Sequence, residues 1–207
     1  MDTYFPIDPN ELSRQYNREA LESLMNLVKK RDGCIKAQCA ADGSKQRRME
    51  GYVKSNVTSP TVHNERVFIT AAIDAHKDRD VMILDIPGAF LHALTKDKVI
   101  MLLRGPLAET MVLIDPERYR PYVTHDKKGV PILYVKMNKA LYGLLRLALD
   151  FYLKLRGELG EKDCVINPYD PCVKNKMIDG NQHTVPWHVD DLKCSHKKSI
   201  LNEKFAT

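Results

Sequence analysis

The sequence predicts an α+β fold in which an antiparallel sheet packs against helices. Two cap-plus-proline pairs, Asp8-Pro9 and Ser59-Pro60, each mark the start of a helix. Short apolar runs separated by Asp-Gly pairs are typical of hairpin strands. A strand ending at Asp85, a long helix and then a hairpin at Asp190-Asp191 follow in the order that such a sheet needs. Two strand ends can then bring distant carboxylates together on one sheet face.

Length and composition set the broad class of the protein. The 207 residues fit one large domain or two small ones, and a hydrophobic fraction of 43% is enough to build a core. Thirty-two basic and 27 acidic residues give a net charge of +5, which is compatible with a polyanionic partner. We find no apolar run of membrane-spanning length and no signal peptide, and therefore expect no membrane association and an intracellular location. The five cysteines lack a C-x-x-C pair and are interpreted as reduced thiols.

Residues 1–33 are predicted to form an N-terminal helix. Asp8 is the expected N-cap, and Glu11 completes a capping box. Apolar residues then recur at helical spacing up to Gly33, the expected stop; they are Leu12, Tyr16, Leu24, Leu27 and Val28.

Residues 34–78 are predicted to hold a hairpin and a second helix. The hairpin has Cys34 to Ala41 as its first strand, Asp42-Gly43 as its turn and a second strand near Tyr52. The helix begins at Ser59-Pro60, and its apolar face carries Val67, Phe68, Ala71, Ala72 and Ala75. Asp74, Asp78 and Asp80 are interpreted as exposed charges near the end of this helix.

Residues 79–207 are predicted to form a sheet with one long helix. The expected strands are 81–85, 99–103, 131–137, 172–178, 182–189 and 192–195, with Asp179-Gly180 as a hairpin turn. The expected helix spans 139–159, with apolar residues at helical spacing.

Asp85, Asp190 and Asp191 are the candidate metal ligands. Adjacent carboxylates at a strand turn repel each other, so the pair Asp190-Asp191 costs free energy unless a cation compensates. Hard oxygen ligands favour Mg²⁺ or Mn²⁺ over zinc. The alternative interpretation is a solvated turn for the pair and a strand-end cap for Asp85.

Several segments match a known family in the right order. Lys36–Gly43 resembles a fingers motif written K-A-R-L-V-A-x-G, and Asp85–Leu91 resembles D-V-x-x-A-F-L. Lys139–Leu144 matches K-A-L-Y-G-L, and Val189–Asp191 matches the V-D-D hairpin, preceded by the similar segment Asn167–Cys172. The chain therefore resembles the reverse transcriptase domain of copia-type (pseudoviral) retrotransposons.

The resemblance implies a right-hand polymerase fold with fingers and palm and without a thumb. Residues 1–33 would be an N-terminal helix, 34–78 a fingers-like hairpin and helix, and 79–207 the palm, with fingers and palm interleaved. The implied activity is RNA-directed DNA polymerase, a nucleotidyltransferase. The implied partners are an RNA template, a DNA primer, deoxynucleoside triphosphates and the remainder of a retrotransposon polyprotein, in a cytoplasmic particle or the nucleus.

The resemblance also assigns site residues. Asp85, Asp190 and Asp191 would be catalytic and, with the backbone carbonyl of Ile86, would hold two Mg²⁺ ions, or Mn²⁺ in their place. Nucleotide contacts would come from Lys36, Phe90, Tyr142 and Gly143. Phe90 would exclude a 2′-hydroxyl from the sugar position.

The cluster Lys45, Arg47 and Arg48 is a candidate template contact, with a solvated face as its alternative. Gln38 stands where the family usually has arginine, and the expected thumb and RNase H regions do not follow. A second hypothesis is therefore a truncated, catalytically inactive retroelement remnant that folds and binds nucleic acid. A two-metal nuclease is the third class, and the motif residues Phe90 and Tyr142 argue against it.

Overall fold

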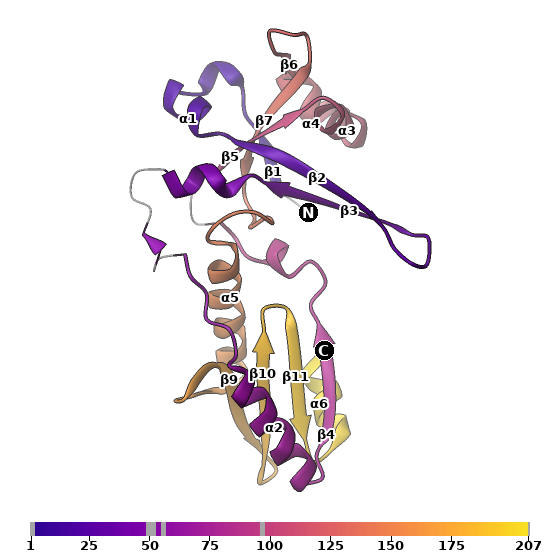
Figure 1. Cartoon of the computed structure of the whole chain (residues 1–207), viewed down its shortest axis with the longest axis vertical. Coiled ribbons are helices and arrows are strands. Elements are labelled where there is room, and N and C mark those ends of the chain that lie inside the picture. Colours follow the sequence, from indigo (N-terminus) through magenta and orange to yellow (C-terminus); the bar gives the residue numbers. More distant parts are fainter. Residues whose placement is uncertain (1–2, 49–52, 55–56, 96–97, 207) are drawn as a thin grey trace. The chain divides into compact units, whose positions relative to one another are not determined.

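The chain folds into two compact units, each built around one sheet (Figure 1). The computed structural model describes residues 3–48, 53–54, 57–95 and 98–206. Unit 1 comprises Met1–Val57 and Phe90–Asp150, and unit 2 comprises Thr58–Ala89 and Phe151–Thr207. The chain therefore crosses between the units three times, at points that differ from the predicted boundaries at 33/34 and 78/79.

Unit 1 contains a six-stranded mixed sheet in the order β1-β7-β5-β2-β3, with β6 also paired to β7. Its strands are β1 (Tyr4–Pro6), β2 (Leu21–Lys29), β3 (Ile35–Ala41), β5 (Ile100–Arg104), β6 (Thr124–His125) and β7 (Pro131–Met137). Its helices are α1 (Arg14–Glu19), α3 (Pro106–Ile114) and α4 (Pro116–Tyr119), with 3-10 turns at Pro9–Glu11, Gly43–Arg48 and Arg120–Tyr122. The pairing of β2 with β5 is parallel, and the other pairings are antiparallel.

One core cluster of unit 1 lies beneath α1. Alternate positions of β5 and β7 point to this face, so that Ile100, Leu102 and Tyr134 pack with Ala20. The hydroxyl of Tyr134 donates to Asn17 at 3.0 Å, which satisfies the polar end of an otherwise buried ring.

Unit 2 contains a five-stranded antiparallel sheet in the order β4-β11-β10-β9-β8. Its strands are β4 (Asp80–Asp85), β8 (Val165–Asn167), β9 (Asp170–Ile178), β10 (Asn181–His188) and β11 (Asp191–His196). Its helices are α2 (Asn64–His76) and α6 (Ser199–Ala206), and α5 (Leu147–Glu161) enters it from Phe151 onward. A further 3-10 turn at Ala89–His92 follows β4, where the chain passes from unit 2 into unit 1.

The two faces of the unit 2 sheet are covered by different helices. On one face Trp187 of β10 stacks on Tyr152 of α5 with ring centroids 6.2 Å apart. On the other face Lys193 of β11 forms an ion pair with Asp74 of α2 at 2.6 Å. Because Leu192 is the cross-strand partner of Trp187 and side chains alternate along a strand, Leu192 and Lys193 point to opposite faces.

The prediction of one helix over residues 1–33 is wrong. Helix α1 ends at Glu19, and Leu21–Lys29 form strand β2, which pairs with β3 in antiparallel register from Ser23↔Ala41 to Lys29↔Ile35. Leu27 is 66% exposed, so the apolar spacing that indicated a helix does not mark a buried helix face. Pairing with β3 decides the conformation, and that contact cannot be read from local periodicity.

The predicted hairpin after Cys34 is also displaced. The turn falls at Asp32-Gly33, where Gly33 has a φ of 84° and the carboxylate of Asp32 accepts from the Cys34 amide at 2.9 Å. The pair Asp42-Gly43 instead opens a 3-10 helix. The second strand that we expected near Tyr52 lies outside the described residues.

Most elements of the predicted 79–207 region are confirmed. Strands β4, β5, β7, β9, β10 and β11 occupy the expected positions, and Asp179-Gly180 forms the turn between β9 and β10 with both φ values positive. The two long helices start later than expected, α2 at Asn64 and α5 at Leu147. Strand β4 is an edge strand rather than a fully buried one, and its Ile83 is 66% exposed.

Candidate functional site

The structure places Asp85 directly opposite Asp191. The apolar, strand-favouring run before Asp85 forms β4, which ends at this residue, and β11 begins at Asp191. The two residues are register partners in the antiparallel β4–β11 ladder. The next pair along the two strands, Ile86 and Asp190, is hydrogen-bonded: the Ile86 amide donates to the Asp190 carbonyl at 3.2 Å. Asp85 and Asp191 are therefore a non-hydrogen-bonded pair, the kind whose Cα atoms approach to about 4.5 Å and whose side chains are closest.

A two-residue turn, Val189-Asp190, carries the third carboxylate. It joins β10 to β11, with His188 and Asp191 as the closing pair. Val189 has a φ of 58°, a left-handed conformation that glycine, asparagine or aspartate normally supplies. A β-branched residue there costs roughly 1–2 kcal/mol. Backbone strain of this kind concentrates at functional sites, and it positions Asp190 beside the Asp85–Asp191 pair.

The carboxylates at this site lack compensating cations within the described residues. Asp85 and Asp191 are exposed, Asp190 is partly exposed, and none of the three carboxylates has a hydrogen bond or ion pair with the described part of the chain. The same-face cation two residues along, Lys193, is engaged by Asp74. Like charges directly opposite each other on adjacent strands destabilise a sheet, so a bound cation would relieve a cost that the fold carries.

The donor set suits a hard divalent cation, but the described residues do not form a complete metal centre. Two opposed carboxylates, with a third in the neighbouring turn, are oxygen ligands of the kind that magnesium prefers. The Ile86 carbonyl, assigned to the metal by resemblance, accepts from the Ala89 amide at 3.1 Å and keeps one lone pair. No group of three His, Cys, Asp or Glu side chains in the described part of the chain is arranged to hold a metal ion. The magnesium site stays a prediction.

The residues expected to contact a nucleotide lie in unit 1, whereas the three aspartates lie in unit 2. Phe90 is 8% exposed and meets Tyr142 edge to face, with ring centroids 4.9 Å apart. Lys36 is exposed on β3, opposite Val28 of β2. The structure therefore brings Phe90 and Tyr142 together and places Lys36 on the long β2–β3 hairpin (Figure 1).

Gly143 serves a close backbone contact inside unit 1. Its φ is 91°, and a Cβ atom at this position would overlap the carbonyl oxygen of Ala41. The Ala41 amide donates to the Tyr142 carbonyl at 2.8 Å, and Gly43 packs equally closely on Gly143. The glycine that we expected to admit a nucleotide thus already admits the end of β3.

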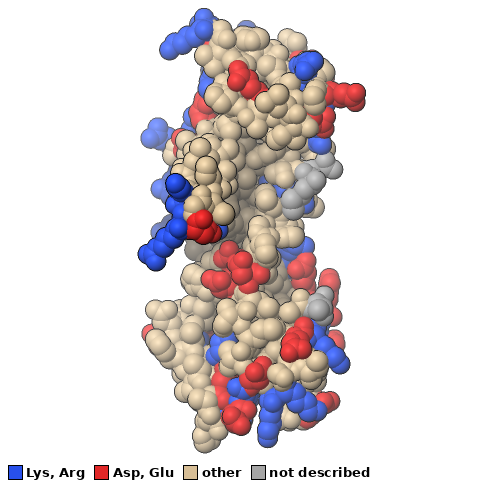
Figure 2. Space-filling model, turned by 90° about the vertical axis from the view of Figure 1, so that its right-hand side faces the viewer, with Lys and Arg blue, Asp and Glu red and all other residues tan. Residues whose placement is uncertain are grey.

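The basic cluster divides into one structural and two exposed cations. Lys45 donates to the Ala20 carbonyl at 3.0 Å and is partly buried, which ties the 3-10 helix Gly43–Arg48 to the start of β2. Arg47 and Arg48 are exposed. On the face shown in Figure 2, basic and acidic side chains are intermixed over both units rather than separated into one positive surface.

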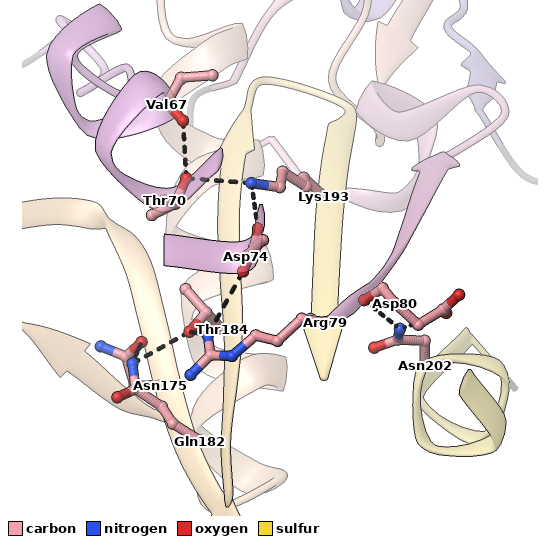
Figure 3. Close-up of polar contacts among 10 residues, drawn as sticks. All are labelled: Val67, Thr70, Asp74, Arg79, Asp80, Asn175, Gln182, Thr184, Lys193 and Asn202. Carbon is pink, nitrogen blue, oxygen red and sulfur yellow. Dashed lines mark hydrogen bonds and ion pairs between the residues drawn. The ribbon is translucent and has the colours of Figure 1, made fainter. Parts of the chain in front are cut away.

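A polar network under α2 was missed by the sequence analysis (Figure 3). Asp74, interpreted as an exposed helix-end charge, is buried and forms ion pairs with Lys193 at 2.6 Å and Arg79 at 3.4 Å. Thr70, one turn before Asp74, is also buried and accepts from Lys193 at 3.3 Å. The available signal was the i, i+4 spacing of Thr70 and Asp74 on one side of an apolar helix.

Comparison with known proteins gives one informative match. The chain is 26% identical over 170 residues to the retrovirus-related Pol polyprotein from transposon TNT 1-94 of Nicotiana tabacum. The match covers 82% of this chain and 11% of that polyprotein, so the chain spans about a tenth of its relative's length. No protein-family model matches the chain. The similarity indicates a retroelement-derived chain that corresponds to a region of a Pol polyprotein.

None of the helices in the described ranges combines the length and the apolar character that crossing a membrane requires. All five cysteines are free, and three of them, Cys164, Cys172 and Cys194, are buried.

Gly143→Ala should strongly destabilise the protein. The substitution combines a left-handed backbone with an overlap on Ala41, so we expect a loss of roughly 2–4 kcal/mol in the free energy of unfolding. Gly33→Ala is the matched control, because Gly33 has a φ of 84° but open space around its Cβ position. Its loss should be about 1 kcal/mol by urea denaturation. Equal losses in the two variants would show that the Ala41 contact is unimportant.

Val189→Gly should stabilise the β10–β11 hairpin. Glycine relieves the left-handed strain but loses more conformational entropy on folding, so the net gain should be about 0.5–1 kcal/mol. Val185→Gly, in the buried middle of β10, should instead destabilise, because it removes a core side chain. A loss of stability in Val189→Gly, measured by the same denaturation assay, would contradict the strained turn.

Proposed function

We propose that this chain is the fingers and palm part of an RNA-directed DNA polymerase from a copia-type retrotransposon. The observation that carries the proposal is the direct register pairing of Asp85 with Asp191, next to Asp190 in a strained turn. These are the aspartates of the D-x-x-x-A-F-L and V-D-D motifs. The similarity to a retrotransposon Pol polyprotein supports the same origin.

The arrangement supports phosphoryl transfer by alignment and charge neutralisation. This reaction needs no covalent nucleophile from the protein, so carboxylates that hold metal ions suffice. Asp85, Asp190 and Asp191, with the free lone pair of the Ile86 carbonyl, would hold magnesium. When bound, magnesium supplies activation of the primer 3′-hydroxyl and neutralisation of charge on the leaving pyrophosphate.

The unit 1 residues would select and hold the nucleotide in this proposal. The buried Phe90 ring is fixed by its edge-to-face contact with Tyr142, and a fixed apolar ring discriminates against a 2′-hydroxyl better than a mobile one. Gly143 would act indirectly, because its contact with Ala41 fixes the segment that carries Tyr142. Lys36 remains a candidate triphosphate contact as an exposed cation on β3.

The proposed partners are an RNA template, a DNA primer, deoxynucleoside triphosphates and the remaining polyprotein, in a cytoplasmic particle or the nucleus. Arg47 and Arg48 are the candidate template contacts, because both are exposed. Lys45 would contribute less, because its ammonium group already donates to Ala20.

A second candidate function is a catalytically inactive remnant that binds nucleic acid. Two observations favour it: the described residues form no complete metal group, and Gln38 replaces a cation of the fingers motif. The remnant and the enzyme differ in their response to magnesium and in primer extension, and both can be measured.

Magnesium should stabilise the protein through the aspartate pair. We expect Mg²⁺ at roughly ten times its Kd to add about 1.4 kcal/mol, or roughly 3–6 °C in Tm at constant ionic strength. Asp191→Asn should lose this shift and, without metal, should be as stable as the parent or more so, because one of two opposed charges is gone. Asp179→Asn, at the turn between β9 and β10, is the matched control and should keep the shift. A shift that persists in Asp191→Asn, or none in the parent, would contradict the metal site.

Primer extension separates the enzyme from the remnant. The chain alone should extend a DNA primer on an RNA template poorly, because it spans 11% of its polyprotein relative. Fusion to the region that follows the match in the tobacco polyprotein should restore extension, and Asp85→Asn in the fusion should lower it by at least two powers of ten. A folded fusion that shows no Asp85-dependent extension would favour the remnant.

A further inference from the structure

A cavity of about 230 Å³ lies between helix α2 and the strands β8, β9 and β10, inside unit 2. Its wall on the sheet side carries three polar residues, Asn175, Gln182 and Thr184, beside Val173, and its helix side carries Ile69 and Ile73. Three cations also line it: Arg66, Lys77 and Arg79. No aspartate or glutamate is among its lining residues, and Asp74, which contacts Arg79, offsets one of the three cations. The lining therefore has a net positive charge and one apolar wall.

Arg79 is the anchor of this cavity. Its side chain is only 5% exposed, and it uses one nitrogen, Nη1, to contact Asp74 at 3.4 Å and Thr184 at 3.3 Å (Figure 3). Within the described part of the chain, its Nε and Nη2 groups have no hydrogen-bond partner. A guanidinium presents five N–H donors in a planar fork that matches carboxylate and phosphate oxygens. None of the Arg79 nitrogens is among the fully buried unsatisfied atoms of the described residues, so this part of the fork reaches the cavity and stays available to a ligand.

The buried charges next to Arg79 do not cancel. Asp74 is one carboxylate, and it lies between two cations, Arg79 and Lys193, with the closer contact to Lys193 at 2.6 Å. The three groups carry a net charge of +1 in a site shielded from solvent. Both cations share one carboxylate, so the excess positive charge of the network favours an anion over a cation as a further partner.

The polar wall also offers surplus donors. The hydroxyl oxygen of Thr184 accepts from both Arg79 and Gln182, which leaves its own hydrogen to donate. Gln182 donates from the same amide nitrogen to the Asn175 carbonyl oxygen at 2.6 Å, which leaves the Asn175 amide nitrogen as a further donor. Arg79, Thr184 and Asn175 thus present donors along the wall of one cavity, and an oxyanion supplies the matching acceptors.

We propose that this cavity binds a small organic oxyanion, with a carboxylate or phosphate head and an apolar body. The head would accept from the Arg79 fork, the Thr184 hydroxyl and the Asn175 amide, and the body would lie against Ile69 and Ile73. A neighbouring cavity of about 380 Å³ shares Lys77, Arg79 and Gln182 and adds Lys197, so the positive field extends past the head group. The site does not depend on the proposed polymerase activity, because none of its residues belongs to the aspartate site.

Titration calorimetry of the full chain with phenyl phosphate, inorganic phosphate and benzoate tests the proposal at constant ionic strength. Saturable binding is expected, with phenyl phosphate at least tenfold tighter than inorganic phosphate because only the former covers the apolar wall. Comparison of benzoate with phenyl phosphate distinguishes a carboxylate from a phosphate head. Arg79→Gln should weaken binding at least tenfold, and Thr184→Val, which removes the hydroxyl donor, should weaken it several-fold.

Arg104→Gln is the matched control, because Arg104 is also paired with carboxylates, Glu22 and Asp126, but lies in unit 1. It should bind phenyl phosphate like the parent. If Arg79→Gln fails to fold, methyl NMR of the parent decides: phenyl phosphate should shift the Ile69 and Ile73 signals and leave Ile100 of unit 1 unchanged. Absence of saturable binding, equal binding by Arg79→Gln, or shifts spread over both units would overturn the proposal.

Discussion

The register of β4 against β11 is the constraint on which unit 2 depends. With Asp85 opposite Asp191, the residues Ile83 and Lys193 also face each other, and the odd-numbered positions of both strands share one sheet face. The even-numbered positions, with Leu84 opposite Leu192, face the side covered by α5 and α6. A slip of one residue would exchange the two faces and place Lys193 in the apolar layer, so packing fixes the register strongly.

That register links the two candidate sites through Lys193. Lys193 lies two residues after Asp191 on the same face and is the natural cation to neutralise the aspartate pair. Its ammonium group instead contacts Asp74 and Thr70 of α2. The polar network under α2 therefore holds two cations, Arg79 and Lys193, and one carboxylate, Asp74. The aspartate pair keeps its unpaired negative charge. One lysine thus contributes to a preference for a cation at the strand ends and for an anion under the helix.

Unit 1 depends on a different contact, the close backbone approach of Gly143 to Ala41. The segment that carries Tyr142 lies against the end of β3, and Gln46 adds a hydrogen bond from the Leu145 amide at 3.0 Å. The same segment gives Phe90 its edge-to-face partner. Phe90 and Tyr142 belong to two motifs that are far apart in the chain, and backbone packing holds them together. This packing accounts for a glycine at position 143 without requiring a ligand.

The sequence by itself determined the elements whose signals are local. The strand ending at Asp85, the Asp179-Gly180 hairpin and the order of the three aspartates follow from apolar runs and turn residues, and the structure has them at these positions. The motif residues also pointed to the retroelement relationship that the tobacco polyprotein supports. The polymerase chemistry proposed for the three aspartates, by contrast, requires magnesium, and the described side chains alone do not form a complete site for it.

Only the tertiary structure decided the features that depend on non-local pairing. Leu21–Lys29 has apolar residues at helical spacing, and its pairing with β3 makes it a strand. The sequence around Asp74 indicates a solvated charge at a helix end, but the structure buries it. Its partners are Arg79, in the loop that follows α2, and Lys193, on a strand more than a hundred residues later in the chain. Local propensity is worth tenths of a kcal/mol per residue, whereas leaving one charge of a buried ion pair without its partner costs about 3–5 kcal/mol. The long-range contacts therefore prevail where the two disagree.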